Sequence, residues 1–239
     1  MATTVTYNIE QNAGDETYSN TNEGYWSTSQ TGTHDPSSTG YTAGPTSPSL
    51  AWKAGFDRTS TKRKYKKGFV RFLDVQVPQG ATITAATLAL NFRDGEDVNY
   101  ILSGFDAANP DPSTMSASDG DHSNHTTANV TFNVPSNGSQ DGMNDNVTTS
   151  PDISDIVQEL VDKADWAAGN AMMFVFPISG SYSNSDEYRM YWTWFDDRDQ
   201  GDTYPSLKTE LSISYEESSG GGSSLKKYGS GLGFGLGYG

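Results

Sequence analysis

The sequence predicts an all-β sandwich with one short amphipathic helix and a Gly-rich C-terminal arm. Several segments alternate apolar and polar residues with a period of two, which is typical of half-buried strands. One segment instead repeats its apolar residues at helical spacing. The last residues place single apolar side chains between glycines, a pattern that builds no core of its own.

Length and composition favour one main domain. All-β sandwiches of more than about 200 residues commonly form a single domain, and this chain has 239 residues. Only 33% of the residues are hydrophobic, but 12% are aromatic, and each aromatic ring can bury a large area. We therefore expect a sandwich domain over residues 1–216 and a Gly/Ser-rich linker with an apolar arm over residues 217–239.

The charge balance is strongly acidic. Fifteen Lys and Arg stand against 30 Asp and Glu, a net charge of −15, which repels phosphate backbones and anionic membranes. We expect no nucleic-acid partner and no membrane. The absence of cysteine excludes disulfides and thiolate metal sites. The N-terminus shows no signal-peptide pattern, so we expect synthesis in the cytoplasm.

The elements follow in order along the chain. Residues 1–50 are rich in Thr, Ser, Gly, Asn and Pro, which predicts short strands and long turns that wrap around a core formed elsewhere. Residues 86–92 and 207–215 alternate apolar and polar positions and predict half-buried strands. The same alternation predicts a strand at Val130, Phe132 and Val134.

Two further strands are more apolar. Residues 171–178, AMMFVFPI, are apolar on both faces and predict a central strand covered on both sides. Residues 188–195, YRMYWTWF, predict a strand with aromatic side chains on both faces.

One segment predicts a helix. Its apolar residues at helical spacing are Ile153, Ile156, Val157, Leu160, Val161 and Ala164. Asp152 can cap the start, and Gly169 with Asn170 can end it. We expect three or four helical turns packed on an end or edge of the sandwich.

The C-terminal arm has its own pattern. After a Gly/Ser linker, glycines alternate with Leu232, Phe234, Leu236 and Tyr238. These apolar side chains need a groove on some other surface, so the arm predicts docking. A disordered terminus is the alternative.

Four motifs in order carry a family resemblance. They are DETY at 15–18, FVRF at 69–72 leading into VPQGATITAATL at 77–88, DISDIVQEL at 152–160, and YPSL at 204–207 leading to ISY at 213–215. Their order and spacing resemble the DNRLRE-type domains of secreted surface proteins, carbohydrate-binding modules and phage virion proteins. The resemblance implies a jelly-roll sandwich and a scaffold, adhesive or virion role.

The sequence offers little for catalysis or metal binding. The three histidines are His34, His122 and His125, and no Gly-x-Ser-x-Gly elbow accompanies them, so we expect no enzyme and no catalytic residue. The His122 and His125 pair lacks further zinc ligands nearby and predicts solvated loop histidines. No cofactor is predicted.

Structural calcium is the alternative to a metal-free chain. Two groups of carboxylates could supply oxygen ligands: Asp119, Asp121, Asp141 and Asp145, and Asp196, Asp197, Asp199 and Asp202. Neither group assigns a particular ligand.

Positive charge is concentrated in one predicted loop. Its residues are Arg58, Lys62, Arg63, Lys64, Lys66 and Lys67. In an acidic chain this run favours docking on an acidic partner, with a solvated loop as the alternative. Among the tryptophans, Trp52 is the best candidate for an exposed ring that stacks on a sugar.

These patterns favour a non-enzymatic structural protein of a phage virion. Such a protein is synthesised in the host cytoplasm and displayed on the virion surface, as a capsid decoration (cement) protein or a head or tail fibre component. Its partners would be capsid or tail subunits and further copies of itself. The alternative is a carbohydrate-binding adhesion module, with a host glycan as partner.

Overall fold

The structure is a computed structural model. It describes residues 2–8, 23–30, 43–46, 52–59, 62–94, 98–120, 122–135, 147–179, 192–195 and 209–217. Its strands are β1 (Thr3–Asn8), β2 (Glu23–Gln30), β3 (Ala43–Thr46), β4 (Trp52–Thr59), β5 (Lys62–Val75), β6 (Thr82–Asp94), β7 (Val98–Phe105), β8 (His125–Val134), β9 (Val147–Thr149), β10 (Asn170–Phe176), β11 (Trp192–Phe195) and β12 (Glu210–Glu216). The helices are α1 (Ser154–Val161) and the short 3-10 helices η1 (Pro112–Thr114), η2 (Ala117–Gly120) and η3 (His122–Asn124).

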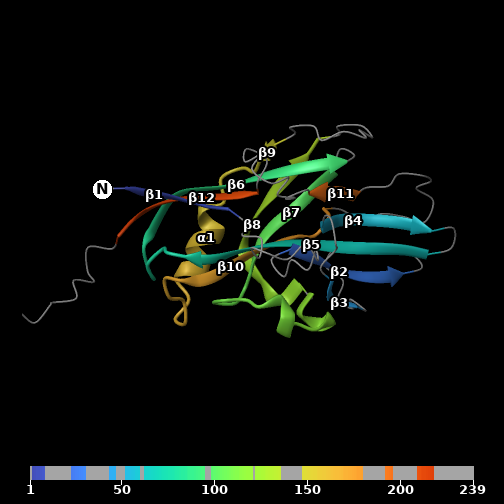
Figure 1. Ribbon diagram of the computed structural model, residues 1–239, viewed down its shortest axis with the longest axis horizontal. Coiled ribbons are helices and arrows are strands. Elements are labelled where there is room, and N and C mark those ends of the chain that lie inside the picture. Colours follow the sequence, from blue (N-terminus) through green and yellow to red (C-terminus); the bar gives the residue numbers. More distant parts are fainter. Residues whose placement is uncertain are drawn as a thin grey trace, which may run out of the picture.

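The strands form two antiparallel sheets that are joined at one end of β6. The first sheet holds β1, β12, β6 and β9. The second runs β11, β4, β5, β10, β7 and β8, with β2 and β3 alongside. β11 pairs with both β4 and the end of β6, and so links the sheets (Figure 1). The prediction of an all-β protein with an accompanying helix is confirmed.

β5 is the longest strand, and it has neighbours along both edges. β2 pairs with residues 63–70 of β5, whereas β4 pairs with residues 62–66 and β10 with residues 68–75. Because a strand has only two edges, β4 and β10 must follow one another along the edge opposite β2. β2, β4 and β5 run side by side toward one end of the molecule, and β1 and β12 lie toward the other (Figure 1).

The core follows the predicted alternation. Ala86, Leu88 and Leu90 of β6 are buried on one face, as are Leu211 and Ile213 of β12. These two strands pair directly, so their apolar rows lie side by side.

The predicted central strand is also confirmed. Residues 171–176 of β10 are all buried, and β10 pairs with β5 on one edge and β7 on the other.

The N-terminal third contributes more to the core than its composition predicts. Trp26 of β2 is completely buried and is among the largest buried side chains. Its ring lies 5.1 Å from Phe69 and is stacked 6.1 Å from Phe105. The expectation that residues 1–50 only wrap around the core is therefore wrong for this residue.

The helix is shorter than predicted. α1 covers eight residues, about two turns, instead of three or four. After Val161 the chain turns, so that Trp166 is buried and its indole N–H donates to the Val77 carbonyl at 2.9 Å. Gly169 does not end the helix; it has a φ of 97° in the turn that enters β10.

Asp152 is predicted to cap the helix, but the N-cap position is Ile153, and Asp152 lies one residue before it. Its carboxylate accepts the Ser154 N–H at 3.1 Å, the Ser154 hydroxyl at 2.8 Å and the Ala86 N–H of β6 at 2.9 Å. Burial raises the pKa of the Asp152 carboxyl, but the hydrogen bonds outweigh it and hold the pKa below its ordinary value. The charged form therefore stabilises the fold.

Replacing this carboxylate should weaken the fold and flatten its acid response. Because the folded-state pKa lies below the unfolded one, the contribution is complete above about pH 4 and is lost as pH falls through the folded-state pKa. We expect Asp152→Asn to lose about 1 kcal/mol of unfolding free energy at neutral pH. Urea unfolding at several pH values should show a smaller further loss on acidification than in the wild type. Asp165→Asn, an exposed carboxylate after α1, serves as control; equal acid responses of all three proteins would contradict the role of Asp152.

Candidate functional site

The segment from Ser150 to Gln158 covers the edge of β6 that faces away from β12. The Ser150 N–H donates to the Leu88 carbonyl at 2.8 Å, and its hydroxyl accepts the Leu88 N–H at 3.0 Å. Gln158 of α1 continues this role with its side-chain amide. It accepts the Ile83 N–H at 2.8 Å and donates to the Ala81 carbonyl at 2.9 Å. Side chains thus replace a missing strand along this edge.

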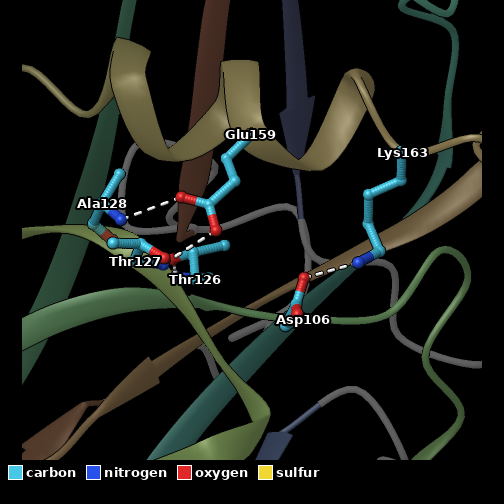
Figure 2. A network of polar contacts seen from close by, with 7 residues as sticks. Asp106, Thr126, Thr127, Ala128, Glu159 and Lys163 are labelled. Carbon is cyan, nitrogen blue, oxygen red and sulfur yellow. Dashed lines mark hydrogen bonds and ion pairs between the residues drawn. The ribbon is translucent and has the colours of Figure 1, made fainter.

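Glu159, the next residue of α1, serves the other sheet. Its two carboxylate oxygens accept the N–H groups of Thr127 and Ala128 in β8, at 2.7 and 2.9 Å (Figure 2). Nearby, Lys163 donates to Asp106 at 2.5 Å, which fixes the chain after β7 to the end of the helix. α1 therefore holds the edges of both sheets together.

The chain after β7 has a second charged anchor. Asp111 caps η1 and lies 3.6 Å from the Arg71 guanidinium of β5. Hydrogen bonds from the Ser113 hydroxyl and N–H lower the pKa of Asp111, and Arg71 adds to this effect. Asp111 thereby fixes to the sheet the start of the 3-10 segment, the stretch of chain that contains η1, η2 and η3.

The basic run is a strand and not the loop that its composition predicts. Four of its residues belong to β5: Lys62, Arg63, Lys64 and Lys66. Their backbones pair with β4, from Thr59 opposite Lys62 to Gly55 opposite Lys66. From residue 63 the opposite edge of this stretch pairs with β2. Pairing on two edges outweighs the low strand preference of lysine. These residues therefore lie in a three-stranded ribbon of β2, β5 and β4, which we call the basic ribbon.

Lys67 is the exception in the basic run because it is buried. Its side chain is 1% exposed, and its ammonium donates to the Gly120 carbonyl and lies 2.8 Å from Nε2 of His125. A lysine in this position binds the chain's own 3-10 segment. Lys67 is therefore not exposed for docking on an acidic partner. The docking role of Lys66, which is half-buried, stays a prediction.

The 3-10 segment fits closely over Trp26. The indole N–H of Trp26 donates to the Ser116 carbonyl at 3.1 Å. A Cβ added at Gly120 would lie 2.7 Å from the Trp26 ring, so only glycine fits there without movement. Trp26, Lys67 and Gly120 together fix the base of the basic ribbon.

The histidine and tryptophan predictions have different outcomes. His125 is not a solvated loop residue: it begins β8, is largely buried, and meets Lys67 through Nε2. Trp26 and Trp166 are buried and offer no ring to a sugar. Only the backbone of Trp52 is described, at the start of β4, so its role as a sugar platform stays a prediction.

Several predicted residues lie outside the described part of the chain. The arm residues Leu232, Phe234, Leu236 and Tyr238 are among them, as are seven of the eight Asp residues considered for calcium. Asp119, the eighth, accepts hydrogen bonds from the Ser116 N–H and hydroxyl. Within the described ranges, no three His, Asp or Glu side chains are grouped to hold a metal ion, and no helix is long and apolar enough to cross a membrane.

No protein-family model matches this chain, and no curated protein matches it. The resemblance to DNRLRE-type domains therefore stays a prediction.

Replacing Glu159 should loosen the contact between α1 and β8. In Glu159→Gln the amide nitrogen takes the place of one oxygen, so one of the two strand N–H groups loses its acceptor. We expect a loss of about 1–2 kcal/mol of unfolding free energy, measured by urea unfolding. Glu217→Gln, an exposed residue after β12, should change stability by less than about 0.5 kcal/mol. Equal effects of the two substitutions would refute the bridging role.

Adjacent lysines should respond differently to the same substitution. Lys67→Met keeps the length of the side chain but leaves the Gly120 carbonyl without this donor, so we expect a loss of about 2–4 kcal/mol. Lys66→Met, at the adjacent half-buried position, should cost clearly less than Lys67→Met. Hydrogen exchange should also accelerate around residues 116–124 in Lys67→Met alone. Comparable losses in both variants would show that Lys67 is not the anchor.

Proposed function

We propose that this protein is a non-enzymatic structural protein of a phage virion with a jelly-roll sandwich. It acts as a capsid decoration (cement) protein or as a head or tail fibre component. In this proposal the chain is synthesised in the host cytoplasm and ends on the virion surface. The basic ribbon and the C-terminal arm attach it to capsid or tail subunits and to further copies of itself.

The separation of charge along the chain carries the proposal. Residues 52–67 contain seven Lys or Arg and one Asp, a net charge of +6, although the whole chain has a net charge of −15. The remaining residues therefore sum to −21. Such a molecule repels its own acidic surfaces but presents one basic element, which favours one orientation on an acidic partner.

The placement of this charge supports docking through a fixed element. Arg63 and Lys64 lie where β5 pairs with both β2 and β4, and the adjacent Lys62 pairs with β4. The buried contacts of Lys67 and Trp26 fix the base of the same ribbon. A fixed element loses less conformational entropy on binding than a flexible loop does. Repetition of a modest contact over a lattice then gives firm attachment.

The test is binding to capsids or tails that lack the protein. The variant Lys62→Glu/Arg63→Glu/Lys64→Glu should bind at least about 10-fold more weakly in co-sedimentation, because each reversed charge removes an attraction and adds a repulsion. Binding of the wild type should also weaken as salt is raised.

The matched control places the same charge change outside the ribbon. Arg189→Glu/Arg198→Glu/Lys208→Glu also shifts the net charge by −6 and should keep binding within a few-fold of the wild type. Equal weakening in both variants would show that net charge alone controls binding. A folded wild-type protein that ignores the particles would overturn the proposed function.

A further inference from the structure

The outer edge of β1 is the starting point. β1 pairs with β12 in continuous register, from Thr3 opposite Tyr215 to Asn8 opposite Glu210. Among the described residues, no strand pairs with the other edge of β1, which ends the strand order (Figure 1). In an antiparallel pair, alternate residues direct their N–H and C=O groups to the outer edge. About half of the backbone groups of β1 are therefore open to a further strand.

The composition of β1 does not protect this edge. Its sequence, TTVTYN, contains no charge and no proline, and it is rich in β-branched and aromatic residues. Natural edge strands usually carry lysine, proline or a bulge that prevents pairing with another strand. The register of β1 with β12 has no bulge. β1 therefore has the composition of a strand that accepts a neighbour.

The apolar face of the first sheet also continues to this edge. Val5 and Tyr7 pack on the core but are only half-buried, while their direct partners in β12, Ile213 and Leu211, are completely buried. The Tyr7 hydroxyl accepts the Gln76 N–H at 2.9 Å, which fixes β1 over the end of β5. One further strand with apolar residues at every second position would cover Val5 and Tyr7.

The arm has this pattern. Leu232, Phe234, Leu236 and Tyr238 alternate with glycines, so an extended arm places all four apolar side chains on one face. The glycine face carries no side chains. The period is the same as that of Val5 and Tyr7 in β1.

The length of the connecting segment favours the chain's own arm. The described chain ends at Glu217, directly after β12, beside the Thr3 end of β1. The 14 residues from 218 to 231 can span up to about 46 Å. β1 is about 20 Å long, and a new strand would lie about 5 Å beyond it. A short flexible linker gives an effective concentration in the millimolar range, which favours pairing within one chain in dilute solution.

We propose that residues 232–238 add as an antiparallel strand to the open edge of β1 in the same chain, with Leu232, Phe234, Leu236 and Tyr238 extending the apolar row of Val5 and Tyr7. This inference deepens the proposed attachment role and rests on it for its biological meaning. In the free protein the arm lies on its own β1; in the assembled particle it exchanges onto β1 of a neighbouring copy, which presents the same edge, and so attaches the two copies to one another.

The experiment compares hydrogen exchange of the β1 peptide in three proteins, with light scattering on each. They are the full chain, a chain that lacks residues 217–239, and the arm variant Leu232→Ser/Phe234→Ser/Leu236→Ser/Tyr238→Ser. We expect about half of the β1 amides to exchange at least about 10-fold faster in both altered proteins. Exchange in β6 should be unchanged, which shows that the domain is folded, and all three should be monomers. Leu225→Ser, in the linker, is the matched control and should behave as the full chain does.

Two results would overturn the proposal. Equal β1 exchange in the full and altered chains means that the arm does not cover this edge. A full chain that is a dimer and becomes a monomer when residues 217–239 are removed assigns the edge to the arm of a second copy. Particle binding is measured separately. If β1 is protected from exchange in a full chain that does not bind particles, the proposed function is wrong and the strand addition still holds.

Discussion

The backbone groups at the edges of the two sheets must find partners, and the segment from Ser150 to Glu159 supplies them on two sides at once. Ser150, Asp152 and Gln158 bond the edge of β6, and Glu159 bonds β8. Unsatisfied N–H groups at a buried edge cost about 1–3 kcal/mol each. The short helix α1 therefore satisfies backbone groups that a neighbouring strand would otherwise satisfy. It also links the two sheets around the core.

This arrangement explains why a helix of two turns is enough. Gln158 and Glu159 are adjacent, and successive helical residues point about 100° apart, so one can reach β6 while the other reaches β8. The apolar side chains of α1, Ile156, Val157, Leu160 and Val161, fill the space between the sheets. A longer helix would carry Trp166 away from the buried position in which its indole bonds Val77.

Part of this structure can be predicted from the sequence. Period-two alternation is a local signal, and it correctly located β6, β8 and β12, whereas a run that is apolar on both faces located β10. Lys66 and Lys67 show what a local signal lacks: they are the same residue type in adjacent positions, yet Lys67 is buried. Its partners Gly120 and His125 lie 53 and 58 residues away in sequence. The roles of Gln158 and Glu159 were missed for the same reason, because no local pattern distinguishes a bridging amide or carboxylate from a solvated one.

The two ends of the strand order are treated differently, and this difference bears on assembly. At β8, the Glu159 carboxylate occupies the N–H groups of Thr127 and Ala128, where the register with β7 shifts. At β1, by contrast, no described strand pairs with the outer edge, and the strand carries no charge. Attachment through a basic ribbon and strand addition at β1 would then use opposite sides of the molecule, which would leave both contacts available at the same time.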